Sequence, residues 1–202
     1  MEDLPPSERT RARAALYQVL SSAFYPPKQN MANVWEAMNR AAEEGAGENQ
    51  PDLARLDLEY NRLFVGPGKL PCPPYESVHR SDRPEMELGL VLGPSTAEVK
   101  GAYAEAGLVI GPAFRDLPDH IAVELEFMHF LCIKELESKG DGARCYRMQK
   151  EFVRSHLKPW VGAFAAKTVA EAKSPFYRLA ATLLDEFVKD EAEYLDVQGR
   201  GD

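Results

Sequence analysis

The chain has 202 residues, a formal net charge of -8, 45% hydrophobic residues and 28% charged residues. This length suits one domain and can bury a sizeable core without disulfide or metal staples. The acidic balance argues against a nucleic-acid backbone as the main partner, because such binding draws on clustered Lys and Arg. An acidic surface would instead attract a cationic partner, although acidic charge also serves solubility alone.

The three cysteines, Cys72, Cys132 and Cys145, are widely spaced and form no CxxC motif. This pattern indicates neither a disulfide framework nor a zinc site, and favours reduced thiols in a reducing compartment. The N-terminus has no basic region followed by an apolar stretch, so no signal peptide is predicted. No apolar run approaches the length of a membrane span. We therefore expect a cytoplasmic protein without stable membrane insertion.

Apolar residues recur at helical spacing along most of the chain. In chain order, the predicted helices cover residues 8–24, 31–44, 51–64, 96–106, 120–139, 144–156, 157–167 and 176–195. Ser7 is the predicted N-cap of the first helix, and Gly45 is expected to stop the second. The helix from His120, opened by residues 116–119, is predicted to be the longest. Residues 144–156 and 157–167 are expected to form one broken helix or two consecutive helices, with Pro159 at the junction because proline interrupts a helix.

Residues 69–78 contain Pro71, Pro73 and Pro74, and this density predicts an extended, irregular segment rather than a helix or a central strand. The nearest candidate for a strand, residues 88–92, is short. No repeat at a fixed period is visible. The sequence therefore predicts an all-α fold: one helical domain over residues 1–202, a bundle of roughly seven to nine helices with a proline-rich irregular segment.

An enzymatic alternative would start from two ExxH sequences, Glu76 to His79 and Glu126 to His129, because paired ExxH motifs on two helices hold di-iron sites. Glu76 follows two prolines, however, so its spacing to His79 need not place both on one helical face. No nucleophile elbow and no phosphate-binding glycine loop is present. The sequence favours a protein that is not an enzyme, with a di-iron carboxylate oxidoreductase as the alternative. A permanent structural subunit of a larger complex is a second rival.

Two blocks have an unusual composition. In residues 60–78, aromatic side chains adjoin a proline-stiffened segment, which suits either a groove for an apolar peptide or a crossover that packs Tyr75 into the core. In residues 117–120, Asp119 either caps the following helix or pairs with an incoming Arg or Lys. His120 and Glu124 share a helical face because they are four residues apart, and Glu126 points away from them.

The sequence resembles the TorD/DmsD/NarJ family of redox-enzyme maturation chaperones. The resemblance lies in four stretches: Leu16-Tyr17-Gln18-Val19-Leu20 with Phe24-Tyr25-Pro26-Pro27; Tyr60-Asn61-Arg62-Leu63-Phe64-Val65-Gly66-Pro67 with Pro73-Pro74-Tyr75-Glu76-Ser77-Val78; Pro118-Asp119-His120 with Glu124-Leu125-Glu126-Phe127-Met128; and His156-Leu157-Lys158-Pro159-Trp160 with Phe176-Tyr177. They follow the family's order along nearly the whole chain, and the middle two are the specific ones.

The resemblance implies a cytoplasmic chaperone that binds the precursor of a molybdenum-cofactor oxidoreductase, in much of the family through a twin-arginine signal peptide, and delays export until the cofactor is inserted. No cofactor, metal or catalytic residue is expected. The candidate peptide-binding residues are Tyr60, Leu63, Phe64, Pro74, Tyr75, Glu76, Ser77, Asp119, His120 and Glu124. The hypothesis is that an aromatic wall from Tyr60 to Tyr75 receives the apolar part of the peptide, while Asp119 and His120, together with Glu124, contact its basic part.

The identity of the client, the bound segment (signal peptide or internal) and the choice between monomer and homodimer stay open. Some family members bind guanine nucleotide weakly, but this sequence has no phosphate loop and we do not predict such binding.

Overall fold

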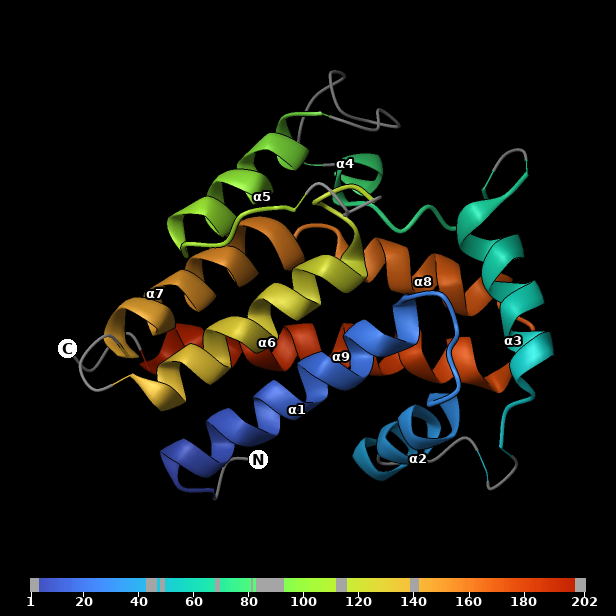
Figure 1. Cartoon of the computed structure of the whole chain (residues 1–202), viewed down its shortest axis with the longest axis horizontal. Helices are drawn as coiled ribbons and strands as arrows, with labels where there is room; N and C mark the ends of the chain where they lie inside the picture. Colours follow the sequence, from blue (N-terminus) through green and yellow to red (C-terminus); the bar gives the residue numbers. More distant parts are fainter. Residues whose placement is uncertain are drawn as a thin grey trace.

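The structure is a computed structural model that describes residues 4–42, 47, 50–67, 70–80, 82, 93–111, 116–138 and 142–198. Over these ranges the chain forms nine α-helices, two π-helical turns and no strand, which confirms the all-α prediction (Figure 1). The elements are α1 (Pro6–Phe24), α2 (Met31–Ala41), α3 (Leu53–Tyr60), η1 (Asn61–Val65), α4 (Glu76–His79), α5 (Pro94–Glu105), α6 (Ile121–Glu137), α7 (Gly142–Phe152), η2 (Val153–Leu157), α8 (Val161–Glu171) and α9 (Pro175–Gln198).

Helices α1 and α6 form an antiparallel pair in the middle of the molecule (Figure 1). The Ser21 hydroxyl donates a hydrogen bond to the carbonyl of Ala122 at 2.8 Å, and the Thr10 hydroxyl donates one to the Glu135 carboxylate at 3.1 Å. The C-terminal end of α1 thus contacts the N-terminal end of α6, and the N-terminal part of α1 contacts the C-terminal end of α6. Helices α8 and α9 pack against each other, and α7 packs along α6.

Aromatic rings join η1, α8 and α9 to helix α1. The Phe24 ring of α1 lies 6.1 Å from Phe64 and 5.5 Å from Phe164, and Phe64 lies 5.4 Å from Tyr177 of α9. All four side chains are at most 3% exposed. Aromatic pairs at such separations add to the free energy that burial already provides. Phe64 is therefore part of the core.

A buried ion pair links α1 to α9. The Arg13 guanidinium donates two hydrogen bonds of 2.7 Å to the Glu191 carboxylate, and the Tyr17 hydroxyl donates a third of 2.8 Å. Arg13 is 1% exposed and Glu191 2%. A bidentate pair of this kind is directional, so it orients α1 relative to α9.

Several predicted boundaries are wrong by a few residues. Helix α1 begins at Pro6 rather than after Ser7, because a proline in the first turn lacks only an N–H that would have no partner there. Helix α2 ends at Ala41 instead of Glu44, and Gly45 lies outside the described residues, as does the strand candidate 88–92. Helix α9, with 24 residues, is longer than α6, with 17.

The break at Pro159 is confirmed, since η2 ends at Leu157 and α8 begins at Val161. None of the described helices combines the length and apolar character that a membrane span requires.

Candidate functional site

The proline-rich residues 70–80, which we call the strap, cross from α3 to the start of α6 and are held near both ends. The backbone N–H of Cys72 donates to the carbonyl of Leu63 in η1 at 3.0 Å. The Arg80 guanidinium donates to the carbonyl of Ser155 in η2 at 2.8 Å. Both acceptors lie in the two π-helical turns, a rare geometry that is often found at functional sites.

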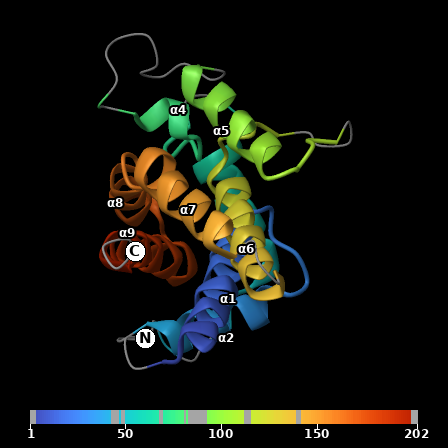
Figure 2. The same cartoon turned by 90° about the vertical axis from the view of Figure 1, so that its left-hand side faces the viewer.

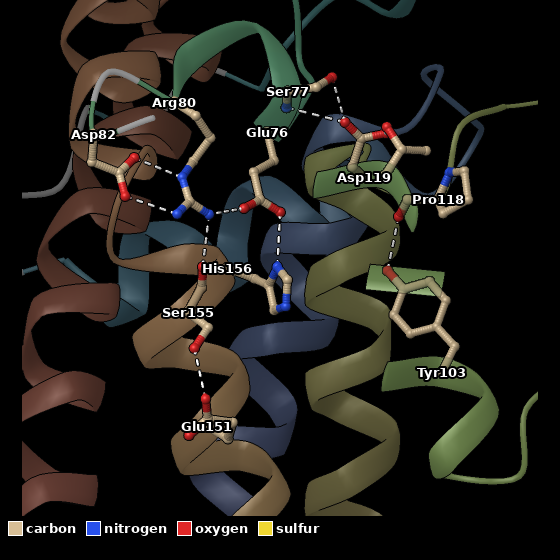
Figure 3. Close-up of polar contacts among 11 residues, drawn as sticks. Glu76, Ser77, Arg80, Asp82, Tyr103, Pro118, Asp119, Glu151, Ser155 and His156 are labelled. Carbon is tan, nitrogen blue, oxygen red and sulfur yellow. Dashed lines mark hydrogen bonds and ion pairs between the residues drawn. The ribbon is translucent and has the colours of Figure 1, made fainter. Parts of the chain in front are cut away.

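Asp119 joins the strap to α5 and α6 (Figure 3). Its carbonyl accepts the backbone N–H of Glu76 at 2.9 Å, and its carboxylate accepts the N–H and the hydroxyl of Ser77 at 3.1 and 2.6 Å. The other carboxylate oxygen accepts the Thr96 hydroxyl at 3.0 Å. The prediction of an irregular segment is therefore wrong at residues 76–78: α4 starts two residues after the last proline, Pro74, and Asp119 accepts its first two backbone N–H groups.

The cap of α6 is His120 rather than Asp119. The Nδ1 atom of His120 accepts the backbone N–H of Ala122 at 3.1 Å. Since Nδ1 accepts a hydrogen bond, the ring proton of neutral His120 lies on Nε2. Burial lowers the pKa of His120 below its usual value, against the opposing effect of the Asp116 and Asp119 carboxylates. His120 is therefore neutral at pH 7.

Glu76 lies in a buried polar cluster beneath the strap (Figure 3). It is fully buried, forms an ion pair with Arg80 and contacts Nδ1 of His156 at 3.0 Å. Arg80 also makes a bidentate pair with Asp82, at 2.7 and 2.8 Å. A buried carboxylate needs such partners, because an isolated charge in the interior is costly. The cluster thus ties α4 to η2.

The two ExxH sequences do not form a metal site. His79 contacts the carbonyl of Pro73 at 2.7 Å, and His129 contacts that of Ala14 at 2.8 Å. Glu126 accepts a hydrogen bond from Tyr25 on the surface. Among the described residues, no group of three or more His, Cys, Asp or Glu side chains could hold a metal ion. The di-iron alternative therefore has no support from the arrangement of these side chains.

Glu124 is fully buried, and neither of its carboxyl oxygens has a hydrogen bond within the described part of the chain. Burial raises its pKa well above the usual value, and the negative charges of Glu76 and Asp119 raise it further. The indole N–H of Trp160, which also lacks a hydrogen bond of normal geometry, is near enough to this carboxyl to oppose the rise in its pKa. Glu124 thus carries its proton at pH values where an exposed glutamate would be charged.

Most of the predicted peptide-binding side chains point inward. The buried ones are Tyr60, Leu63, Phe64, Pro74, Glu76, Ser77, Asp119, His120 and Glu124, whereas Tyr75 is partly exposed. The structure does bring the two predicted blocks together, because Tyr75 and His120 form an isolated antiparallel bridge. Tyr60, Leu63 and Phe64 belong to the core, so they support this site from below. An incoming cation would reach the Asp119 carboxylate only after the strap moved.

Around the buried His120 ring lie four side chains that reach the surface, Tyr25, Tyr75, Asp116 and Glu126, and we call these five residues the acidic-aromatic patch. The His120 ring lies between the two tyrosines, 6.2 Å from Tyr25 and 5.3 Å from Tyr75. The Tyr25 hydroxyl donates to Glu126 at 2.7 Å, and the Tyr75 hydroxyl donates to Asp116 at 3.0 Å. Burial and these carboxylates raise the pKa of both tyrosines, so both hydroxyls remain donors at neutral pH.

Sequence reasoning missed Asp116, Glu126 and Tyr25 as members of the site. Asp116 stands at the predicted opening of a helix, where an acid is normally read as a dipole partner. Helical spacing predicts that Glu126 points away from His120 and Glu124, and in the structure Glu126 lies on the exposed side of α6. The only signal that could have joined them is their contact with the two tyrosines, which are far away along the chain.

Comparison with known proteins agrees with this architecture. Residues 26–166 match the profile of the family described as nitrate reductase delta subunit. The chain is 25% identical to the chaperone protein TorD of Shewanella pealeana over 92% of this chain and 90% of the relative. It is 35% identical to the perchlorate reductase assembly chaperone protein of Dechloromonas aromatica over 65% of this chain and 58% of the relative.

A solved structure gives the same result at the level of the fold. It is described as a redox enzyme maturation protein from Archaeoglobus fulgidus, aligns with a TM-score of 0.57 at 25% identity, and covers 88% of this chain and 93% of its own. These relatives are named chaperones or maturation proteins rather than catalysts. The chain therefore belongs to the nitrate reductase delta subunit family, that is, the TorD/DmsD/NarJ family, and it is a maturation chaperone and not an enzyme.

Proposed function

We propose that the protein, as one helical domain in the cytoplasm, binds the twin-arginine signal peptide of a molybdenum-cofactor oxidoreductase precursor and delays its export until cofactor insertion and assembly are complete. The family supports this proposal, because a relative is named as an assembly chaperone for perchlorate reductase. The bound segment is the finer part of the proposal, and it depends on the chemistry of the exposed site.

The acidic-aromatic patch is the observation that carries this proposal. Asp116 and Glu126 are exposed carboxylates, each held in place by a tyrosine hydroxyl. An arginine guanidinium pairs with a carboxylate through directional hydrogen bonds and is also attracted to aromatic faces. Two carboxylates beside an aromatic stack therefore suit a segment that carries neighbouring arginines. The net charge of -8 would speed the encounter with such a basic segment.

The proposed role of the patch is binding alone, through charge pairs and contacts with aromatic rings. The burial of Asp119 and His120 fits this role, because Asp119 holds Ser77 of the strap and His120 caps α6. Binding through exposed carboxylates leaves that support intact.

The test measures the affinity of the chain for a client precursor with and without its signal peptide, by calorimetry. We expect the precursor without the peptide to bind much more weakly. Replacing Asp116→Asn together with Glu126→Gln should weaken binding of the complete precursor by about tenfold, because exposed charge pairs contribute up to roughly 1 kcal/mol each.

The matched control is Glu36→Gln, since Glu36 is an exposed carboxylate on α2. It should leave the affinity unchanged. Equal affinity for the precursor with and without its signal peptide would contradict the proposal and indicate an internal segment instead.

A further inference from the structure

An apolar hollow lies beside the acidic-aromatic patch. It is bounded by residues 108–111, which follow α5, and by Val123, Phe127 and Phe130 of α6, and it has a volume of about 300 Å³. We call it the α5–α6 groove. Its walls are mostly apolar, and Glu126 is the carboxylate at its edge.

The floor of the groove is closely packed. The Phe127 ring packs 4.7 Å from Tyr103 and 4.8 Å from Phe152. The Tyr103 hydroxyl donates to the carbonyl of Pro118 at 2.8 Å, which connects the end of α5 to the segment before α6 (Figure 3). Figure 2 shows α5 packed across the top of the helices that include α6 and α7. The groove therefore exists without a partner, and binding would cost little ordering of the protein.

One rim of the groove is unusually exposed. Gly107 has a φ of +81° and turns the chain out of α5, where the N–H of Leu108 bonds to the carbonyl of Tyr103 at 2.9 Å. The next residue, Val109, is 90% exposed, the highest value for any large apolar side chain in the described residues. It adjoins partly buried Leu108 and Ile110, so the apolar surface is continuous. A continuous exposed apolar surface beside a hollow indicates an interaction site.

Glu126 belongs to both the groove and the patch. It lines the groove and also accepts the hydroxyl of Tyr25. Negative charge therefore stands at one end of the apolar hollow, next to the Asp116 carboxylate that Tyr75 holds. A peptide that fits must carry its cations beside its apolar residues. Secretory signal peptides have this order, a basic region followed by an apolar stretch.

We propose that the α5–α6 groove receives the apolar stretch of the client's signal peptide while the acidic-aromatic patch holds its arginines. This inference rests on the proposed function and specifies which surface gives the peptide its apolar contacts. In this proposal the groove provides the apolar contacts that the sequence had assigned to Tyr60, Leu63 and Phe64, because these three side chains are buried in the core. Charge favours a basic peptide as the occupant. A second copy of this acidic chain would bring more carboxylates close to Glu126, which is unfavourable.

The test uses the full-length chain and two synthetic peptides. The first carries an arginine pair followed by an apolar stretch, and the second keeps the arginines but has Ser and Gly in place of the apolar residues. Val109→Asp should lower the affinity for the first peptide about tenfold, because the groove loses an apolar contact and gains a negative charge. It should leave the weaker binding of the second peptide nearly unchanged. Val109 is so exposed that the variant should fold normally, which circular dichroism checks.

Leu58→Asp is the matched control, because Leu58 on α3 is also exposed, at 72%, and is remote from the groove along the chain. It should not alter either affinity. Wild-type protein that binds neither peptide would overturn the proposed function and this inference with it. Wild-type binding of the first peptide with no change in Val109→Asp would overturn the groove alone. A shift from dimer to monomer in Val109→Asp, with unchanged peptide affinity, would show that the groove is a self-association surface and would also overturn it.

Discussion

The buried ion pair between Arg80 and Glu76 allows a quantitative test of how the strap is held. Arg80→Ala removes the partner of a fully buried carboxylate, and it also removes the bonds to the carbonyl of Ser155 and to Asp82. Loss of one partner from a buried pair costs about 3–5 kcal/mol, because the remaining charge stays in the interior. Glu76 keeps its contact with Nδ1 of His156, so it is not left without any polar partner. We therefore expect a loss near the lower end, about 3 kcal/mol.

A loss of this size should lower the melting temperature by roughly 6–12 °C in a chain of about 200 residues. Urea denaturation followed by circular dichroism gives the free energy directly. Arg154→Ala is the control, because Arg154 and its partner Glu151 are 66% and 62% exposed, and an exposed pair contributes under about 1 kcal/mol.

The double variant Glu76→Gln with Arg80→Ala should recover part of the loss, because no charge is then left buried. An Arg80→Ala variant that loses no more stability than Arg154→Ala would refute the argument that the cluster anchors the strap.

Two further predictions concern buried groups. Burial raises the pKa of Glu124 in the folded protein above its pKa in the unfolded chain. The contribution of Glu124 to the free energy of unfolding is therefore complete below the unfolded-state pKa and is lost as the pH rises through the folded-state pKa. Glu124→Gln should therefore stabilise the protein relative to wild type more at about pH 8 than at about pH 5, in urea denaturation; an equal difference at both pH values would contradict the buried position of this carboxyl. Cys72 and Cys132 are 0% exposed, and burial raises the pKa of both thiols, that of Cys132 to about 12. Both should react with a thiol reagent only on unfolding, and rapid labelling of the native protein would count against this.

The fold class and the approximate helix positions followed from local rules. Apolar residues at helical spacing predict helices, and prolines mark where they stop; the break at Pro159 is an example. The errors lie at helix ends, where capping chooses among several neighbouring residues. Ser7 is a good N-cap in isolation, yet Pro6 already begins α1.

The roles of the site residues depend on contacts that no local pattern reveals. A carboxylate at the start of a helix normally caps that helix, so Asp119 was a natural cap for α6. In the structure it serves Ser77 and Thr96 instead, since the strap and α5 bring their donors closer. Buried donors and acceptors must pair with whatever the fold places beside them.

The sequence alone determined the all-helical class, the helix order and the resemblance to a chaperone family, because these depend on periodicity and on residues close together in the chain. Only the tertiary structure decided which aromatic and acidic side chains are exposed. Phe64 is buried in the core, whereas Asp116 and Glu126 accept hydrogen bonds from tyrosines that are 41 and 101 residues away along the chain. The physical reason is that burial is a property of the whole packed assembly, and each side chain's exposure is set by distant neighbours.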